Sequence, residues 1–248
     1  MKFSEKLISL LKNDPVVSVL TGAGVSAESG VETFRGENGL WRKFKPEELA
    51  SVDAFLSNPE LVWEWYNLRQ NIVRDIEPNP GHYSIAEMEN IFTSFYIITQ
   101  NVDGLHKRAG NTRPIELHGN IMRNICTGCC KLFDEIEFTG EVQIPYCDSC
   151  SSMLRPDVVW FGEMLPEEAL KDAENAIMNT EVFFSIGTSA VVQPAASMPV
   201  WAKNNGAYLV EINIEETPLT FYADESIRGR SGEVLPELIE EIKKEIHE

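Results

Sequence analysis

The stretch VVSVLTGAGVSAESG (residues 16–30) defines the first structural unit of this 248-residue chain. An apolar run of strand length, residues 16–20, leads into a turn where Gly22, Gly24 and Ala27 match the pattern G-x-G-x-x-G/A. Glycines at this spacing allow a tight turn and a close approach of the backbone to a pyrophosphate. The stretch therefore predicts a phosphate-binding turn after a buried strand. A glycine-rich turn without a ligand stays open as an alternative, because the motif alone is weak.

The same alternation of strands and helices continues along the chain. Further apolar runs of strand length occupy residues 95–98, 158–161, 182–186 and 208–212, and each ends in a polar or glycine-rich turn. Alternation of this kind predicts a parallel sheet with helices on both faces and functional groups at the carboxyl ends of the strands. A simple hydride-transfer enzyme is disfavoured, because no second strand ends in an acidic residue about 20 residues after the glycine turn.

The cysteines predict a metal site. Cys126-x-x-Cys129 and Cys147-x-x-Cys150 are separated by 17 residues, a spacing typical of zinc ribbons. Four thiolates leave no open position for water, so we expect the zinc to be structural. Cys130 does not fit the pairing and is interpreted as a bystander. Reduced cysteines without a metal remain the alternative.

Two stretches interrupt the strand–helix alternation, namely the aromatic-rich residues 36–80 and the cysteine-containing residues 121–155. We therefore expect an α/β fold in which a smaller inserted lobe, made of a zinc ribbon and a helical module, joins a Rossmann-like parallel-sheet domain. The expected sheet domain is discontinuous and covers residues 1–36, 77–120 and 156–248. The expected inserted lobe combines a helical module at 37–76 with a zinc-binding module at 121–155.

Charge and composition limit the partners and the location. The chain has 39 acidic and 21 basic residues, for a formal net charge of −18, so we expect no direct binding to nucleic acid, which needs a basic patch. The N-terminal residues lack the apolar core of a signal peptide, and no apolar run approaches the roughly 20 residues of a membrane span. Clustered cysteines favour a reducing compartment, so we expect a cytoplasmic protein without membrane association.

The motifs in their order resemble the sirtuin family of NAD-dependent protein-lysine deacylases, over residues 16–234. The resemblance rests on GAGVSAESG (22–30), TFRG (33–36), TQNVDGLHKRAG (99–110), ELHG (116–119), the four cysteines, VVWFGE (158–163), GTSAVVQPA (187–195) and IN (212–213). It implies NAD as co-substrate, one structural zinc ion, and acylated lysine side chains of proteins or peptides as partners. The implied reaction releases nicotinamide, deacylated lysine and O-acyl-ADP-ribose.

The resemblance also implies the roles of individual residues. His118 matches the general base, and Asn101 and Asp103 match catalytic positions beside it. The matching NAD-binding positions are Gly22, Ala23, Gly24, Ala27, Glu28, Phe34, Arg35, Trp41, Gln100, Asn101, Val102, Asp103, Gly187, Thr188, Ser189, Asn213, Ile214, Glu215 and Ser231. The matching substrate-binding positions are Ala50, Tyr66, Arg69, Val159 and Phe161.

Histidine suits a general base because its unperturbed pKa of about 6.5 lies close to the working pH. His118 follows the strand-like IEL and precedes Gly119, so it is expected to project from a strand end into a cleft. A structural, hydrogen-bonded histidine is the alternative. Asn101 and Asp103 are also common turn-forming residue types.

The segment NPELVWEWYNLRQNIVRDI (58–76) predicts a helix that Asn58 caps. Leu61, Trp65, Leu68 and Ile72 lie on one stripe, which we expect to be core, with Tyr66 and Arg69 on its shoulder. A phenol beside a guanidinium can receive a carboxylate, and the pair resembles the Tyr-x-x-Arg of sirtuins that remove succinyl and malonyl groups. Ala50 matches the small residue that leaves space for a longer acyl chain. A packed tyrosine and an arginine bridging a surface acid are the alternative.

Two other functions remain compatible with the same motifs. A mono-ADP-ribosyltransferase would share the NAD-splitting step, and a non-catalytic module would sense NAD or ADP-ribose. His118, Asn101 and Asp103 together argue against a module without activity. We therefore predict a deacetylase that also removes succinyl and malonyl groups.

Overall fold

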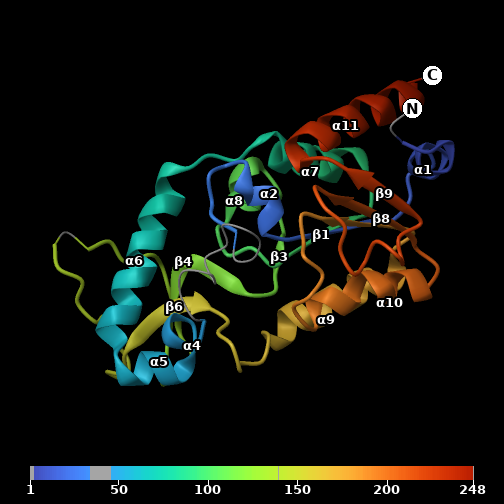
Figure 1. Ribbon diagram of the computed structural model, residues 1–248. Helices are drawn as coiled ribbons and strands as arrows, with labels where there is room; N and C mark the ends of the chain where they lie inside the picture. Colours follow the sequence, from blue (N-terminus) through green and yellow to red (C-terminus); the bar gives the residue numbers. More distant parts are fainter. Residues whose placement is uncertain (1–2, 34–45, 139, 248) are drawn as a thin grey trace.

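A six-stranded parallel sheet forms the larger lobe of the chain, whose computed structural model describes residues 3–33, 46–138 and 140–247 (Figure 1). The strand order is β3-β2-β1-β7-β8-β9, and every pairing is parallel. The chain therefore winds outward in one direction from β1 and in the other from β7, so the order reverses between these two strands. Ligands of such sheets bind at the carboxyl ends of the strands beside this reversal. The strands are β1 (Val17–Thr21), β2 (Phe95–Thr99), β3 (Ile115–Glu116), β7 (Val182–Ile186), β8 (Tyr208–Asn213) and β9 (Glu225–Arg228).

Helices cover both faces of this sheet, as the sequence predicts (Figure 1). One apolar cluster joins the sheet to α1 (Glu5–Leu11), α7 (Pro80–Ile91) and α11 (Ser231–His247). A second cluster joins the opposite face to α9 (Glu167–Asn179) and α10 (Met198–Asn204), which follows the short 3-10 helix Ala195–Ser197. Every residue of β1 and β7 is buried, because each central strand is covered from both sides. The short helices α2 (Ala23–Ala27) and α8 (Leu105–Ala109) follow β1 and β2.

The smaller lobe contains a three-stranded antiparallel sheet and a helical module. Its strand order is β5-β4-β6, formed by β5 (Leu132–Phe133), β4 (Gly119–Cys126) and β6 (Leu154–Val158). The helices are α4 (Pro46–Leu49), α5 (Val52–Ser57) and α6 (Pro59–Asp75). The predicted cap of α6 is confirmed, because the Asn58 side chain accepts a hydrogen bond from the Leu61 amide at 3.1 Å. A third apolar cluster holds this lobe together.

One expectation for the parallel sheet is wrong, and one for helix α6 is wrong in part. Residues 158–161 are not a strand of the parallel sheet: β6 ends at Val158 and belongs to the antiparallel sheet, and Phe161 is 44% exposed. Of the stripe of α6 expected in the core, only Trp65 is buried, whereas Leu61, Leu68 and Ile72 are exposed. The buried side of α6 carries Val62, Trp63, Trp65, Tyr66, Gln70 and Val73.

Within the part of the chain that the structure describes, no helix is both long enough and apolar enough to cross a membrane.

Candidate active site

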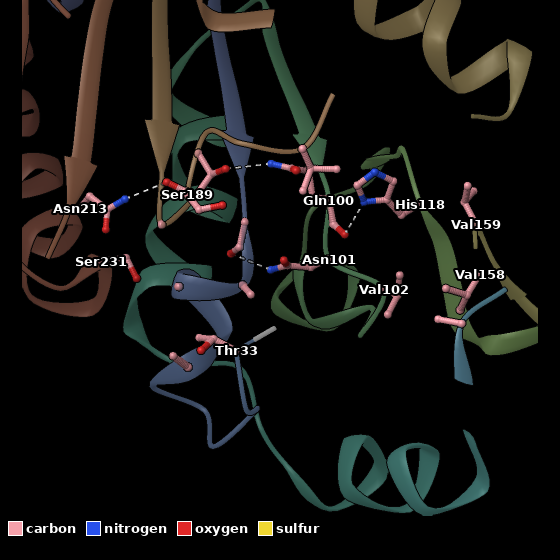
Figure 2. A pocket seen from close by; sticks show the side chains of 18 of the residues that line it. Thr33, Gln100, Asn101, Val102, His118, Val158, Val159, Ser189, Asn213 and Ser231 are labelled. Carbon is pink, nitrogen blue, oxygen red and sulfur yellow. Dashed lines mark hydrogen bonds between the residues drawn. The ribbon is translucent and has the colours of Figure 1, made fainter. Parts of the chain in front are cut away.

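A cavity of about 820 Å³ opens where the carboxyl ends of the parallel strands meet the smaller lobe. Its lining comes from the turn after β1, the segments after β2, β7 and β8, the start of α11, and residues 158–163. The cavity therefore lies at the reversal of strand order, which is the position that the fold favours for a ligand. Figure 2 shows side chains from several of these segments converging on it.

The glycine turn after β1 packs against the loop after β7. The Gly24 amide donates to the Gly187 carbonyl at 2.8 Å, and the Gly22 amide donates to the Ile186 carbonyl at 3.1 Å. A Cβ atom on Gly22 or Gly24 would lie 2.8 or 2.7 Å from the Gly187 oxygen. Gly187 itself has φ +61°, and its Cβ would meet the Val25 amide nitrogen at 2.6 Å. The glycines at these three positions are therefore required for the two loops to touch.

Three amide side chains that line the cavity tie the strand ends together (Figure 2). Gln100 Nε2 donates to Thr188 Oγ1 at 3.0 Å, and Asn213 Nδ2 donates to the Thr188 carbonyl at 2.8 Å. Asn101 Nδ2 donates to the Gly22 carbonyl at 3.1 Å. These bonds hold the β1, β2, β7 and β8 ends in one fixed arrangement.

Asp103 is buried, and its partner is Ser26, which was not among the site residues predicted from the sequence. Asp103 Oδ2 accepts from Ser26 Oγ at 2.7 Å, and Oδ1 accepts from the Leu105 amide at 2.9 Å. Burial raises the pKa of the Asp103 carboxyl, although these bonds and the charge of Arg69 act in the opposite direction. Ser26 Oγ also accepts from Asn101 Nδ2 at 3.1 Å. The position of Ser26 inside the glycine motif was the sequence signal that could have identified it as a site residue.

His118 lines the cavity and is oriented by one backbone contact. Its Nδ1 lies 3.0 Å from the Gln100 carbonyl oxygen, which can only accept a hydrogen bond. Nδ1 therefore carries the proton of the neutral ring, and Nε2 keeps a free lone pair. Burial lowers the pKa of His118, against the smaller opposite effect of this hydrogen bond. The ring is thus held in the neutral form that can accept a proton.

Two further histidines lie behind the site and do not line the cavity. His82 and His106 are buried with their ring centroids 4.9 Å apart. His106 Nε2 lies 2.8 Å from Thr21 Oγ1, and His82 Nε2 lies 3.3 Å from Ser26 Oγ. His82 also accepts from the Asn79 amide in the capping box of α7. These contacts give both histidines a structural role in the floor of the site.

The small-lobe end of the cavity contains the predicted acyl pair. Ala50, Tyr66, Arg69, Val159 and Phe161 all line the cavity that His118 lines. Tyr66 is fully buried rather than on a shoulder, and burial raises its pKa to about 12. The Arg69 guanidinium carbon lies 4.7 Å from the centre of the Trp65 ring and 6.0 Å from that of Tyr66. Burial lowers the pKa of Arg69, but a guanidinium remains charged.

The other predicted cofactor residues have mixed placements. Ala23, Ala27, Val102, Ser189, Ile214 and Glu215 line the cavity. Glu28 and Ser231 also line it and bond to each other, because Ser231 Oγ donates to Glu28 Oε1 at 3.0 Å. Phe34, Arg35 and Trp41 lie outside the described residues.

The four predicted zinc ligands form one cluster. The Sγ atoms of Cys126, Cys129, Cys147 and Cys150 all lie within 4.8 Å of one another. A tetrahedron of sulfurs with Zn–S bonds of 2.3 Å has edges of about 3.8 Å, so the arrangement fits a zinc ion. The Gly128 and Cys129 amides donate to Cys126 Sγ at 3.3 and 3.4 Å. Cys130 is exposed and is not part of this group.

Comparisons with known proteins agree with this geometry. The sequence model of the Sir2 family matches residues 22–194. An NAD-dependent protein deacylase 2 of Pyrobaculum aerophilum is 51% identical over 228 residues, which cover 92% of this chain and 91% of that protein. The crystal structure of a Sir2 homolog–NAD complex has a TM-score of 0.91 and 46% identity, over 98% of this chain and 95% of that one. A Sir2–p53 peptide–NAD+ structure has a TM-score of 0.82 and 32% identity, over 96% and 97% of the two chains.

Proposed function

Because this chain belongs to the Sir2 family and is an NAD-dependent protein deacylase, we propose that its cavity binds NAD beside an acylated lysine and accepts acidic acyl groups. The observation that carries the proposal is that the glycine turn, His118 and the Tyr66–Arg69 pair all line one cavity. In the reaction, the acyl oxygen attacks the ribose carbon that bears nicotinamide, and the bond from that carbon to nicotinamide breaks. Water supplies the atoms that release the free lysine, and the acyl group remains on ADP-ribose.

We propose that NAD lies along the carboxyl ends of the parallel strands. The glycine turn would approach the phosphates through its backbone, as such turns do where they lead into a helix. Gln100 and Asn101 would line the nicotinamide end, with Asp103 buried behind them on Ser26 Oγ, and Asn213 and Glu215 would line the adenosine end. The complex of a Sir2 homolog with NAD supports this assignment through its likeness to the whole chain.

We propose His118 as the general base. It would take a proton from a ribose hydroxyl, so that this oxygen can attack the acyl carbon. The support is its tautomer: Nδ1 is fixed on the Gln100 carbonyl, which leaves Nε2 as the acceptor in the cavity. Its lowered pKa keeps the ring unprotonated at neutral pH, as a base requires.

The acyl specificity is proposed from Tyr66 and Arg69. Arg69 supplies a positive charge beside a phenol that stays protonated, because its pKa of about 12 lies far above neutral pH. An ionised carboxylate only accepts hydrogen bonds, so two donors at this place complement it. Peptides with neutral acyl-lysine are proposed as substrates as well, since a smaller acyl group fits the same space. The Sir2–p53 peptide–NAD+ structure supports a peptide substrate.

An acyl-peptide panel tests this proposal. Acetyl-, butyryl-, succinyl- and malonyl-lysine peptides are incubated with NAD, and the products are identified by mass spectrometry. Butyryl is the matched control for succinyl, because it has the same four-carbon chain without the carboxylate. Arg69→Met should lower kcat/KM for succinyl by about 30-fold or more, in line with a charged hydrogen bond of about 2 kcal/mol, and much more than for acetyl or butyryl.

Equal losses for all acyl groups would remove the specificity proposal. ADP-ribosylated protein in place of O-acyl-ADP-ribose would instead indicate a transferase.

A further inference from the structure

The hydroxyl of Tyr66 forms a hydrogen bond with a residue outside the Tyr66–Arg69 pair. The indole Nε1 of Trp160 donates to Tyr66 Oη at 2.8 Å, and both side chains are buried. The two rings are close, with centroids 6.3 Å apart. Trp160 belongs to the segment 158–163, which is far from α6 in the sequence, and it also lines the cavity. One hydrogen bond therefore joins two of the segments that line the acyl end.

This contact decides which way the phenol proton points. A phenolic O–H prefers the plane of its ring, so the oxygen offers one in-plane position to its proton and the other to an incoming donor. An indole N–H is a donor only. When Trp160 fills one position as the donor, the proton of Tyr66 must take the other, and the phenol can only donate to a further ligand.

The indole ring is itself held in place. The guanidinium carbon of Arg155 lies 4.1 Å from the Trp160 ring centre. Arg155 in turn binds Glu163 through two contacts of 2.8 and 3.1 Å, and Glu163 accepts from the Trp160 backbone amide at 2.8 Å. Phe55 packs against the same ring at 5.3 Å. The ring thus has little freedom to release Tyr66.

We propose that Trp160 is a specificity-positioning residue: its indole N–H sets Tyr66 as a hydrogen-bond donor toward the carboxylate of an acidic acyl-lysine. The inference rests on the acidic-acyl function proposed above and deepens it. It assigns Trp160 no contact with the carboxylate, since its effect passes through Tyr66. A neutral acyl group has no terminal carboxylate, so it gains nothing from this orientation.

The proposal predicts a change in selectivity when only the N–H is lost. Trp160→Phe keeps an aromatic ring beside Arg155 and Phe55 but removes the donor. Selectivity is the ratio of kcat/KM for succinyl-lysine to kcat/KM for butyryl-lysine peptide. This ratio should fall about fivefold, the value of one ordinary net hydrogen bond. The fall should appear in KM for the succinyl peptide, because binding of the carboxylate and not the chemical step is weakened.

Trp63→Phe is the matched control. Trp63 is buried in the same lobe, and its Nε1 donates to the Leu154 carbonyl at 3.0 Å, but it does not line the cavity. The same chemical change at Trp63 should lower stability and leave the selectivity ratio within about twofold. A second control is Tyr66→Phe, because Trp160→Phe should have no further effect on the ratio once the Tyr66 hydroxyl is gone.

Each outcome decides the inference. A fivefold fall that disappears in the Tyr66→Phe background supports it. An equal fall in both backgrounds, an equal fall in Trp63→Phe, or no fall while Tyr66→Phe does lower the ratio overturns it and leaves the acidic-acyl function standing. If Tyr66→Phe and Arg69→Met both leave the ratio unchanged, the acidic-acyl function fails and this inference fails with it.

Discussion

The two lobes that enclose the cavity are stabilised in different ways. The parallel sheet has an apolar cluster on each face, and its two central strands are buried along their whole length. The smaller lobe has one apolar cluster, a three-stranded sheet, and hydrogen bonds from α6 side chains to the backbone, such as Gln70 Nε2 to the Ile121 carbonyl at 2.8 Å. Its four clustered cysteines join two segments of this lobe that are separate in the sequence.

This difference has a functional meaning. The proposed NAD side of the cavity comes from the larger lobe, whose order follows from burial of its strands. Much of the proposed acyl side comes from the smaller lobe, whose single apolar cluster is supplemented by a four-cysteine site and a few polar contacts. Damage to the smaller lobe should therefore weaken the binding of acyl-lysine while the fold of the parallel sheet is still intact. Three predictions examine this contrast.

Removal of the metal should have the largest effect. Structural zinc contributes on the order of 10 kcal/mol to the folding of small zinc domains. Cys126→Ser should therefore abolish stoichiometric zinc and deacylase turnover, while the far-UV circular dichroism of the sheet lobe persists. Zinc is measured by atomic absorption. Trp63, Trp65 and Trp160 belong to the apolar cluster of the smaller lobe, so a change in tryptophan fluorescence reports unfolding of that lobe.

Cys130→Ser is the matched control for that variant. Cys130 is exposed and lies outside the cluster, so its variant should keep full zinc content and turnover. Normal activity of Cys126→Ser without zinc would show that the smaller lobe holds itself together, and the contrast between the lobes would be lost.

A substitution that creates a cavity in the core of the parallel sheet should have the next largest effect on stability. Phe184 of β7 is completely buried, so Phe184→Ala should lower the free energy of unfolding by about 3–5 kcal/mol. Phe133 of the smaller lobe is only partly buried, and Phe133→Ala should cost less than half as much. Urea unfolding followed by circular dichroism measures both. Equal costs would mean that the two cores contribute alike.

Acid should weaken the larger lobe through His82. Burial lowers its pKa to about 4, whereas an unfolded chain has a histidine pKa of about 6.5. The unfolded chain therefore binds the proton first: the stability from neutral His82 is complete above pH 6.5 and is lost as the pH falls toward 4. The full loss is about 3 kcal/mol. His106, whose pKa burial also lowers, acts in the same direction.

His82→Gln isolates this contribution, because glutamine at the same helix position keeps a capping acceptor without a titrating group. The unfolding free energy at pH 7 and pH 4.5 is compared in both proteins. The drop on acidification should be smaller in the variant. Since acid also protonates cysteine thiolates, the difference between the two proteins is the informative quantity. An unchanged drop would contradict the assignment to His82.

Much of the sheet lobe and of the cavity could be predicted from the sequence. The central strands are recognisable in the sequence as apolar runs followed by glycine or polar turns. The spacing of the four cysteines, which is that of a zinc ribbon, predicts their cluster. The motifs also identified His118, Tyr66 and Arg69, which the structure places around one cavity. These features are local in sequence, so one chain is enough to reveal them.

The orientation of α6 could not be predicted in the same way. Periodicity finds an apolar stripe but not the side that the rest of the fold covers. Leu61, Leu68 and Ile72 are exposed, because α6 packs against the rest of the lobe through its opposite side. That buried side carries Trp63, Tyr66 and the polar Gln70. Gln70 looks unsuitable for a core until its long-range bond to the Ile121 carbonyl is known. The same limit applies to residues 158–161, an apolar run that lines a cavity.

The contact among Gly22, Gly24 and Gly187 has a consequence for protein engineering. Each position is closed by the backbone of a neighbouring loop and not by a flexible side chain, so no partner can move aside for a substitution. A library that randomises one of these codons should return glycine almost alone, and compensating changes elsewhere offer no route around it. Attempts to redirect this scaffold to another dinucleotide should begin instead at the end of the cavity proposed to hold the adenosine.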